Sequence, residues 1–173
     1  MSNYKLLLKQ IKCLAFDVDG VFTDGQVYLF PGNEFVRSVN IKDGYAVQHC
    51  IKMGFPIAII TGGNSDEVRK RFEYLGVTDI YMRSSSKIGD YEDFRMKYGF
   101  DHSEILFMGD DLPDYEIMKL VGLPACPADA AHEIREISKY ISDKKGGEGC
   151  ARDVIEQVLR IHDKWLVDES YQW

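Results

Sequence analysis

The chain of 173 residues is 45% hydrophobic and 28% charged, and its formal net charge is -7. This balance is typical of a folded globular domain and excludes a disordered chain. The acidic balance argues against nucleic acid as a main partner, because phosphate backbones are bound by clustered Lys and Arg. No apolar run is long enough to cross a bilayer or to form a signal-peptide core. We therefore expect residues 1–173 to form a single cytoplasmic domain with no membrane partner.

Cysteine usage points to a reducing compartment. The four cysteines are far apart in the sequence and form no CxxC pair. Most of them lie in apolar surroundings, so we interpret them as reduced, buried side chains of an intracellular protein. They are Cys13, Cys50, Cys126 and Cys150.

Short apolar runs alternate with longer amphipathic segments along the chain. The runs that predict buried strands are 12–17, 56–61, 79–82 and 105–108. Helical spacing of apolar residues predicts helices over 43–53, 65–75, 87–98, 112–120 and 150–165. Strands that alternate with helices are typical of a parallel sheet covered on both faces. The sequence thus predicts an α/β fold with three layers, Rossmann-like, around a central parallel sheet.

One segment interrupts this alternation. Residues 26–29 and 35–39 flank a loop at 30–34 that contains Pro and Gly, which predicts a small β-hairpin flap over about 26–39. The hairpin follows the first strand directly, so it should project from the carboxyl edge of the sheet. The chain has no room for a large cap domain. The polar residues after Trp165 are expected either to be mobile or to dock on a neighbouring molecule.

Polar side chains follow the predicted strands where each one ends. Asp17 and Asp19 follow the first strand and Thr61 the second, while Lys87 opens the helix after the third. Three further carboxylates follow the fourth strand, namely Asp110, Asp111 and Asp114. Ligands of open α/β sheets bind beyond the carboxyl ends of the strands. We therefore expect these groups to meet in one site.

These residue types suit metal-assisted phosphoryl transfer. Clustered carboxylates repel one another unless a cation lies between them, and an oxygen-only set suits Mg²⁺. One carboxylate can attack phosphorus, and a second can protonate the leaving oxygen and then activate water. A lysine can offset charge, and a hydroxyl can bind phosphoryl oxygens. Two simpler explanations stay open: Lys87 as a surface lysine, and Asp114 as a helix N-terminal residue favoured by the helix dipole.

The stretch Asp17-Val18-Asp19-Gly20-Val21-Phe22-Thr23-Asp24-Gly25 resembles the first motif of the haloacid dehalogenase superfamily. Thr61-Gly62, Lys87 and Gly109-Asp110-Asp111-Leu112-Pro113-Asp114 are similar to its second, third and fourth motifs, in the same order. The resemblance implies that Asp17 is the nucleophile and a metal ligand, and that Asp19 is the general acid and base. It also implies three further roles: a metal-binding backbone carbonyl at Asp19, phosphoryl binding by Thr61 and pairing of Lys87 with Asp17. Asp110 would be the third ligand of Mg²⁺, supported by Asp111 and Asp114.

Between about residues 11 and 159 the chain resembles the capless branch of 3-deoxy-D-manno-octulosonate 8-phosphate phosphatases and their relatives that act on nine-carbon ulosonate phosphates. The likeness includes Asp43-Gly44 and the glycine-rich stretch 146–149. It implies a tetramer in which a neighbour's hairpin and C-terminal segment help to close the site. The exposed apolar residues Val27, Leu29 and Phe35 would be covered in such an assembly. The glycines at 146–149 would approach a ligand, or simply form a loop before a helix.

Substrate recognition departs from that pattern. The octulosonate enzymes usually carry an Arg after the Thr-Gly of the second motif, and here Gly63 takes that position. A second carboxylate-binding Arg corresponds to Arg71, and Arg83 is a candidate substitute for the missing group. The substrate-binding residues expected are Asp19, Asn40, Lys42, Asp43, Gly44, Thr61, Gly62, Gly63, Asn64, Arg71 and Lys87.

We therefore expect a Mg²⁺-dependent phosphatase for a 2-keto-3-deoxy sugar acid phosphate, with the eight-carbon octulosonate as the first candidate. The alternatives are a nine-carbon ulosonate 9-phosphate or another sugar phosphate. A mutase would need a larger cap to exclude water. A non-catalytic regulatory module that keeps the fold is the alternative from another class. No motif residue is lost, and this favours the enzyme.

Overall fold

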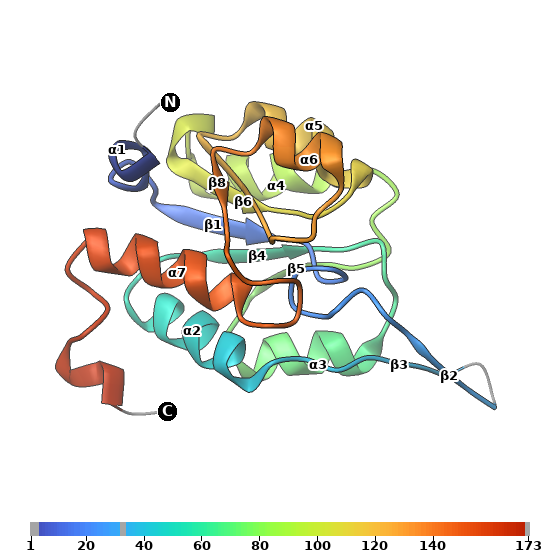
Figure 1. Ribbon diagram of the computed structural model, residues 1–173. Coiled ribbons are helices and arrows are strands. Elements are labelled where there is room, and N and C mark those ends of the chain that lie inside the picture. The colour runs from blue at the N-terminus through green and yellow to red at the C-terminus, as the bar shows by residue number, and fades with distance from the viewer. Residues whose placement is uncertain (1–3, 32–33, 172–173) are drawn as a thin grey trace.

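The computed structural model describes residues 4–31 and 34–171, and its centre is a six-stranded parallel sheet (Figure 1). The strands lie in the order β5-β4-β1-β6-β7-β8, so the first strand of the chain is central. Their bounds are β1 (Cys13–Phe16), β4 (Ile57–Ile60), β5 (Asp79–Tyr81), β6 (Ile105–Met108), β7 (Leu123–Cys126) and β8 (Tyr140–Ile141). β1 pairs with β4 on one side and with β6 on the other, so the strand order changes direction at β1.

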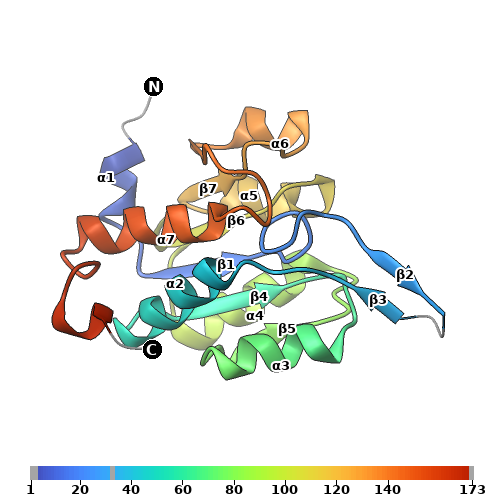
Figure 2. The same cartoon turned by 60° about the horizontal axis from the view of Figure 1, so that its bottom comes forward.

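Helices cover both faces of the sheet, which confirms the predicted three-layer α/β fold. The α-helices are α1 (Tyr4–Leu8), α2 (Ile41–Lys52), α3 (Asp66–Tyr74), α4 (Lys87–Tyr98), α5 (Tyr115–Leu120), α6 (His132–Ile137) and α7 (Cys150–Ile161). The 3-10 turns are η1 (His102–Glu104), η2 (Leu112–Asp114) and η3 (Asp168–Tyr171). Figures 1 and 2 show α2, α3 and α7 on one face and α4, α5 and α6 on the other.

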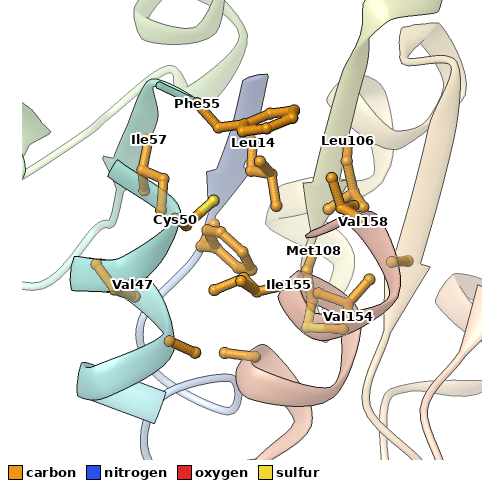
Figure 3. Close-up of a cluster of buried hydrophobic side chains, with 14 of the residues drawn as sticks. Leu14, Val47, Cys50, Phe55, Ile57, Leu106, Met108, Val154, Ile155 and Val158 are labelled. Carbon is orange, nitrogen blue, oxygen red and sulfur yellow. The ribbon is translucent and has the colours of Figure 1, made fainter. Parts of the chain in front are cut away.

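Alternate residues of each central strand build two separate cores. In β1, Leu14 and Phe16 join the core under α2, α3 and α7, whereas Cys13 and Ala15 join the core under α4, α5 and α6. Figure 3 shows the first of these cores, where side chains of α2 and α7 converge on Leu14 and Leu106. Because side chains alternate across a strand, a fully apolar run can supply both faces at once.

The predicted elements agree with the structure in type, with several corrections. The four predicted strands are present, but β7 and β8 were missed, because β7 contains Pro124 and β8 has two residues. The helix predicted over 112–120 begins as η2 and continues as α5. The last predicted helix is too long, since α7 ends at Ile161. After it the chain turns at Asp163, which has a φ of 57°.

The predicted hairpin is present and projects away from the sheet, at the right of Figure 1. It consists of β2 (Tyr28–Phe30) and β3 (Glu34–Val36), which pair in antiparallel fashion. Gly32 and Asn33 of the predicted loop lie outside the described residues. Within the described part of the chain, this hairpin is the insertion between β1 and α2, and no large cap domain is present there.

The described part of the C-terminal segment packs on its own chain. Nε2 of His49 in α2 lies 3.0 Å from the carbonyl oxygen of Lys164, and the Tyr45 hydroxyl donates to the carbonyl of Ser170. Trp165 is buried and packs edge-on against the His49 ring. Residues 172 and 173 of the predicted tail lie outside the described residues.

Two predictions from composition can be compared with the structure. All four cysteines are buried and free, as predicted. In the described ranges, 4–31 and 34–171, no helix combines the length and apolar character needed to cross a membrane.

Candidate active site

The carboxyl ends of β1, β4 and β6 meet at one edge of the sheet and form an open pocket of about 530 Å³. The backbone N–H of Asp17 donates to the carbonyl of Met108 at 3.0 Å, which fixes the end of β1 beside the end of β6. The lining residues are Asp17, Asp19, Thr61, Gly62, Gly63, Ser84, Ser85, Ser86, Lys87, Ile88, Pro113 and Glu116. Four separated parts of the chain thus supply one site, as predicted from the strand ends.

A buried lysine joins two of the aspartates. Nζ of Lys87 lies 2.9 Å from Oδ2 of Asp17 and 2.8 Å from Oδ1 of Asp114. The Lys87 side chain is 8% exposed and the Asp114 side chain is fully buried. Lys87 is the first residue of α4, so that helix directs the ammonium into the site. The simpler reading of Lys87 as a surface lysine is therefore wrong.

The backbone of Asp110 is held by Asp114 and Ala131, and its carboxylate packs on the first motif. Its N–H donates to Oδ2 of Asp114 at 3.1 Å, and its carbonyl accepts from the N–H of Ala131 at 2.8 Å. The Asp110 carboxylate packs on Gly20, where a Cβ would lie 1.9 Å from Oδ2. Gly20 also has a φ of 81°, which disfavours other residues. The glycine after the Asp-x-Asp pair is therefore required for Asp17 and Asp110 to approach each other.

The carboxylates of this cluster are poorly solvated and repel one another. Burial, and then the charge of Asp114, raise the pKa of Asp17, and the contact with Lys87 offsets this only in part. Burial, followed by the charges of Asp17 and Asp114, raises the pKa of Asp110 to about 7. Although burial opposes its charged form, Lys87 has a raised pKa because two carboxylates surround it. The cluster carries more negative charge than Lys87 neutralises.

The donor set at this point fits a hard divalent cation. One oxygen from each of Asp17, Asp110 and Asp114 lies within 4.8 Å of the others. Both oxygens of Asp114 are already engaged, one by Lys87 and one by the Asp110 N–H. Both oxygens of Asp17 are engaged as well, by the Val18 N–H and by Lys87. Asp114 is fully buried, however, whereas Asp17 lines the pocket and Asp110 is partly exposed, so Asp17 and Asp110 are better placed to bind an ion. An all-oxygen cluster with unbalanced charge is the environment that Mg²⁺ occupies in proteins.

Asp19, the second aspartate of the first motif, is held by two side chains. Thr23 is fully buried and donates to Oδ1 of Asp19 at 3.3 Å. Arg37, just after β3, donates from Nε to Oδ1 at 2.6 Å and from Nη2 to Oδ2 at 3.1 Å. Sequence reasoning missed Arg37, because its pairing depends on where the hairpin returns to the sheet edge. A basic residue at the end of a predicted flap was the available signal.

The second motif lies in a loop that is tied to the loop before α4. The N–H of Ser84 donates to the carbonyl of Thr61 at 3.0 Å, and that of Arg83 donates to the carbonyl of Gly63 at 3.0 Å. The Thr61 hydroxyl accepts from the Gly63 N–H at 3.0 Å and lines the pocket. Arg83 is exposed and has a φ of 54°, and it is not among the described lining residues.

The remaining predicted substrate residues are not among the described residues that line the pocket. Asn64 is exposed beside the adjoining narrow hollow, and Lys42 is exposed in the first turn of α2. Asn40 caps α2 by accepting from the Lys42 N–H at 2.9 Å. The Arg71 guanidinium lies against Gly44, where a Cβ would meet Nη2 at 2.5 Å.

Asp43 is fully buried and supports the N-terminus of α7. Its Oδ1 accepts from the backbone N–H of Arg152 at 2.6 Å, while its Oδ2 has no hydrogen-bond partner among the described residues. Burial raises the pKa of Asp43 to about 6, and the hydrogen bond from Arg152 opposes this rise. The contact joins α2, which starts beside the hairpin, to α7.

The glycine-rich stretch before α7 packs on the catalytic loop. A Cβ at Gly146 would lie 2.1 Å from the carbonyl oxygen of Gly20, and the Gly147 N–H donates to the carbonyl of Val21 at 2.9 Å. The Cys150 thiol contacts the same carbonyl at 3.2 Å. The stretch forms the loop before α7, which is one of the two predicted roles. The stretch supports the backbone that carries Asp17 and Asp19.

Comparisons with known proteins agree with this arrangement. A family model described as haloacid dehalogenase-like hydrolase matches residues 75–153. The 3-deoxy-D-manno-octulosonate 8-phosphate phosphatase of Yersinia pestis is 33% identical over 154 residues, which cover 89% of this chain and 82% of that protein. A crystal structure of the enzyme from that organism has a TM-score of 0.91 at 31% identity, covering 94% of this chain and 88% of the other.

A further solved structure carries ligands. It is the 3-deoxy-D-manno-octulosonate 8-phosphate phosphatase of Moraxella catarrhalis in complex with magnesium, phosphate and KDO. It has a TM-score of 0.89 at 31% identity and covers 93% of this chain and 92% of that one.

The fold, the aspartate cluster and these matches define a hydrolase of the haloacid dehalogenase superfamily that acts on phosphoric monoesters. Within that superfamily, the chain belongs to the branch of the 3-deoxy-D-manno-octulosonate 8-phosphate phosphatases.

Proposed function

We propose that this protein is a cytoplasmic, Mg²⁺-dependent phosphatase that hydrolyses 3-deoxy-D-manno-octulosonate 8-phosphate, with residues 1–173 acting as one domain. The observation that carries the proposal is the buried Asp17–Lys87–Asp114 arrangement beside Asp110, at the end of an open pocket. This arrangement offers a nucleophile and a cation site that face the same space. The relatives named for this substrate match nearly the whole chain.

In this proposal Asp17 attacks phosphorus and forms an aspartyl-phosphate, while the P–O bond to the sugar breaks. Asp19 gives its proton to the leaving sugar oxygen, then takes a proton from the water that attacks the aspartyl-phosphate. The water oxygen bonds to phosphorus, and inorganic phosphate leaves as Asp17 is restored. Lys87 holds Asp17 in place and offsets its charge, and Thr61 together with backbone N–H groups binds phosphoryl oxygens.

Asp17, Asp110 and the backbone carbonyl of Asp19 would hold Mg²⁺, with Asp111 and Asp114 in support. The ion would neutralise the incoming phosphate and so reduce its repulsion by the carboxylates. Asp111 is exposed and caps η2, because its Oδ1 accepts from the Leu112 N–H at 2.8 Å. Its support would therefore act through the shape of the loop that carries Asp110.

The pocket suits a sugar phosphate in size and polarity. A volume of about 530 Å³ lies within the range of small-molecule sites. Three consecutive serines, Ser84, Ser85 and Ser86, line one wall and offer hydroxyls to a polyol. Lys87 is the one cation among the described lining residues, and it is already paired. A substrate carboxylate would thus need an arginine from the surroundings, and Arg71 is the proposed partner.

A homotetramer is part of the proposal. Hairpin residues expose large apolar side chains, with Leu29 at 74%, Phe35 at 57% and Val27 at 43%. A neighbouring subunit would cover this apolar surface and narrow the open side of the pocket. Sedimentation velocity would test the assembly: a monomer at micromolar concentration would contradict it.

The test of function is steady-state phosphate release with Mg²⁺ from a panel of sugar phosphates that includes the octulosonate and nonulosonate compounds. We expect kcat/KM for the octulosonate to exceed that of generic sugar phosphates by at least about a hundredfold, a discrimination of about 3 kcal/mol. Preference for the nine-carbon compound would change the substrate and keep the chemistry. No turnover of any phosphomonoester would favour a non-catalytic regulatory module.

A further inference from the structure

Arg37 connects the hairpin to the catalytic carboxylate. It follows β3 directly, and both ends of its guanidinium group contact Asp19, at 2.6 Å from Nε and 3.1 Å from Nη2. A third donor, Nη1, lies 3.4 Å from the carbonyl of Phe35 in β3. One side chain thus binds the flap backbone and the acid–base residue at the same time.

The contact is a partly buried, two-donor ion pair rather than a single contact on the surface. Paired N–H donors match the two oxygens of a carboxylate, which restricts its rotation as well as attracting its charge. The Arg37 side chain is only 16% exposed, whereas that of Asp19 is 38% exposed and lines the pocket. The fully buried Thr23 also donates to Oδ1 of Asp19. The carboxylate is therefore fixed while one part of it stays open to the pocket.

Gly63 lies directly beside this contact. A Cβ at Gly63 would lie 3.5 Å from Oδ2 of Asp19 and 4.0 Å from Nη2 of Arg37. A long side chain there would start within van der Waals distance of both partners. The hollow beside the pair holds about 10 Å³, roughly one water molecule, so little solvent reaches the contact from that direction.

We propose that Arg37 is a positioning residue that holds the Asp19 carboxylate in line for proton transfer and couples it to the hairpin. The inference rests on the proposed function, because it needs Asp19 to act on the leaving group. The effect of Arg37 on the rate of leaving-group release should depend on how much the leaving oxygen needs a proton. An alkyl phosphate such as a sugar phosphate needs one, and p-nitrophenyl phosphate needs almost none.

The test compares Arg37→Ala with wild type in single turnovers, following release of the leaving group. With the best sugar phosphate we expect release to slow by about tenfold to a hundredfold, part of the range found for acid–base catalysis, while KM changes little. With p-nitrophenyl phosphate the first release should stay close to wild type. Arg160→Ala is the matched control, because Arg160 makes a similar two-donor contact with Glu156 on the exposed face of α7.

Several results would overturn the inference. An equal loss with both esters would mean that Arg37 supports the site generally, and a rise in KM alone would make it a substrate-binding residue. Faster turnover would mean that Arg37 holds Asp19 away from the reaction. Arg37→Lys keeps the charge without the planar pair of donors, so wild-type turnover in that variant would also contradict positioning.

The test is independent of which sugar is the substrate. It uses whichever sugar phosphate the wild type hydrolyses best. A preference for a compound other than the octulosonate would therefore refute the substrate and leave the role of Arg37 open to the same comparison. Thermal unfolding of each variant separates a loss of positioning from a loss of the fold.

Discussion

Lys87 is the residue whose replacement tests the electrostatic design of the site most directly. In Lys87→Met the ammonium is lost, and a side chain of similar length fills the space. Asp17 and Asp114 then share a buried site with no cation, although Asp17 keeps the Val18 N–H at 2.7 Å and Asp114 keeps the Asp110 N–H at 3.1 Å. Removing one partner of a buried ion pair costs about 3–5 kcal/mol. We expect Lys87→Met to lower the free energy of unfolding by this amount at pH 7.5 and to abolish phosphate release.

The cost should shrink as the pH falls. Asp17 and Asp114 already have raised pKa values, with burial as the main cause, and loss of Lys87 raises both further. Between about pH 4 and pH 7 the folded variant then binds more protons than the unfolded chain, so its stability rises as the pH is lowered. Wild type follows the same direction more weakly. The difference between the two proteins should therefore be smaller at pH 5.5 than at pH 7.5.

Urea unfolding in the presence of EDTA measures both effects, because a bound cation would stabilise the folded state separately. Lys70→Met on the exposed surface of α3 is the control and should change stability by less than about 0.5 kcal/mol. Two results would refute this reasoning. One is a Lys87→Met protein as stable as wild type at pH 7.5, and the other is a loss of stability relative to wild type that is the same at both pH values.

Three further predictions concern the supports of the site. Gly146→Ala should lower stability by about 1–3 kcal/mol in urea unfolding, because its Cβ would meet the catalytic loop, whereas Gly89→Ala in α4 should not. The wild type should lose up to about 3 kcal/mol of unfolding free energy as the pH rises from 4 to 6, because buried Asp43 with a pKa near 6 must then ionise. Asp43→Asn cannot ionise at this position and should lack that loss. Identical pH profiles of the two proteins would contradict this. Arg71→Ala should raise KM for the sugar acid far more than it lowers kcat, and an unchanged KM would remove Arg71 from the substrate site.

Local patterns in the sequence were sufficient for the elements and for the catalytic edge. The helix predicted over 65–75 is present as α3, and the hydroxyl of its N-cap Ser65 accepts from the Val68 N–H at 3.3 Å. Lys87 was predicted to open a helix, and it does. Apolar runs that end in Asp17, Thr61 or Asp110 identify strands and their carboxyl ends, because parallel strands all end at the same edge. Short strands that contain Pro, such as β7, lack that signal.

Contacts across the chain were beyond the reach of those patterns. Asp114 looked equally like a helix residue and a site residue, and only the position of α4 shows that Lys87 binds it. Gly146 looked like a loop glycine, and its closeness to Gly20 depends on how α7 packs on α2. In each case the deciding partner is distant in sequence, and no local propensity encodes it.

The sequence by itself determined the class of fold, the order of the strand ends and the identity of the carboxylates, because these follow from periodicity and from residue chemistry along the chain. Only the tertiary structure decided how the charges are paired. Lys87 lies between Asp17 and Asp114, and Arg37 returns from the hairpin to hold Asp19. Pairing depends on distances of a few ångströms between segments that the fold alone brings together.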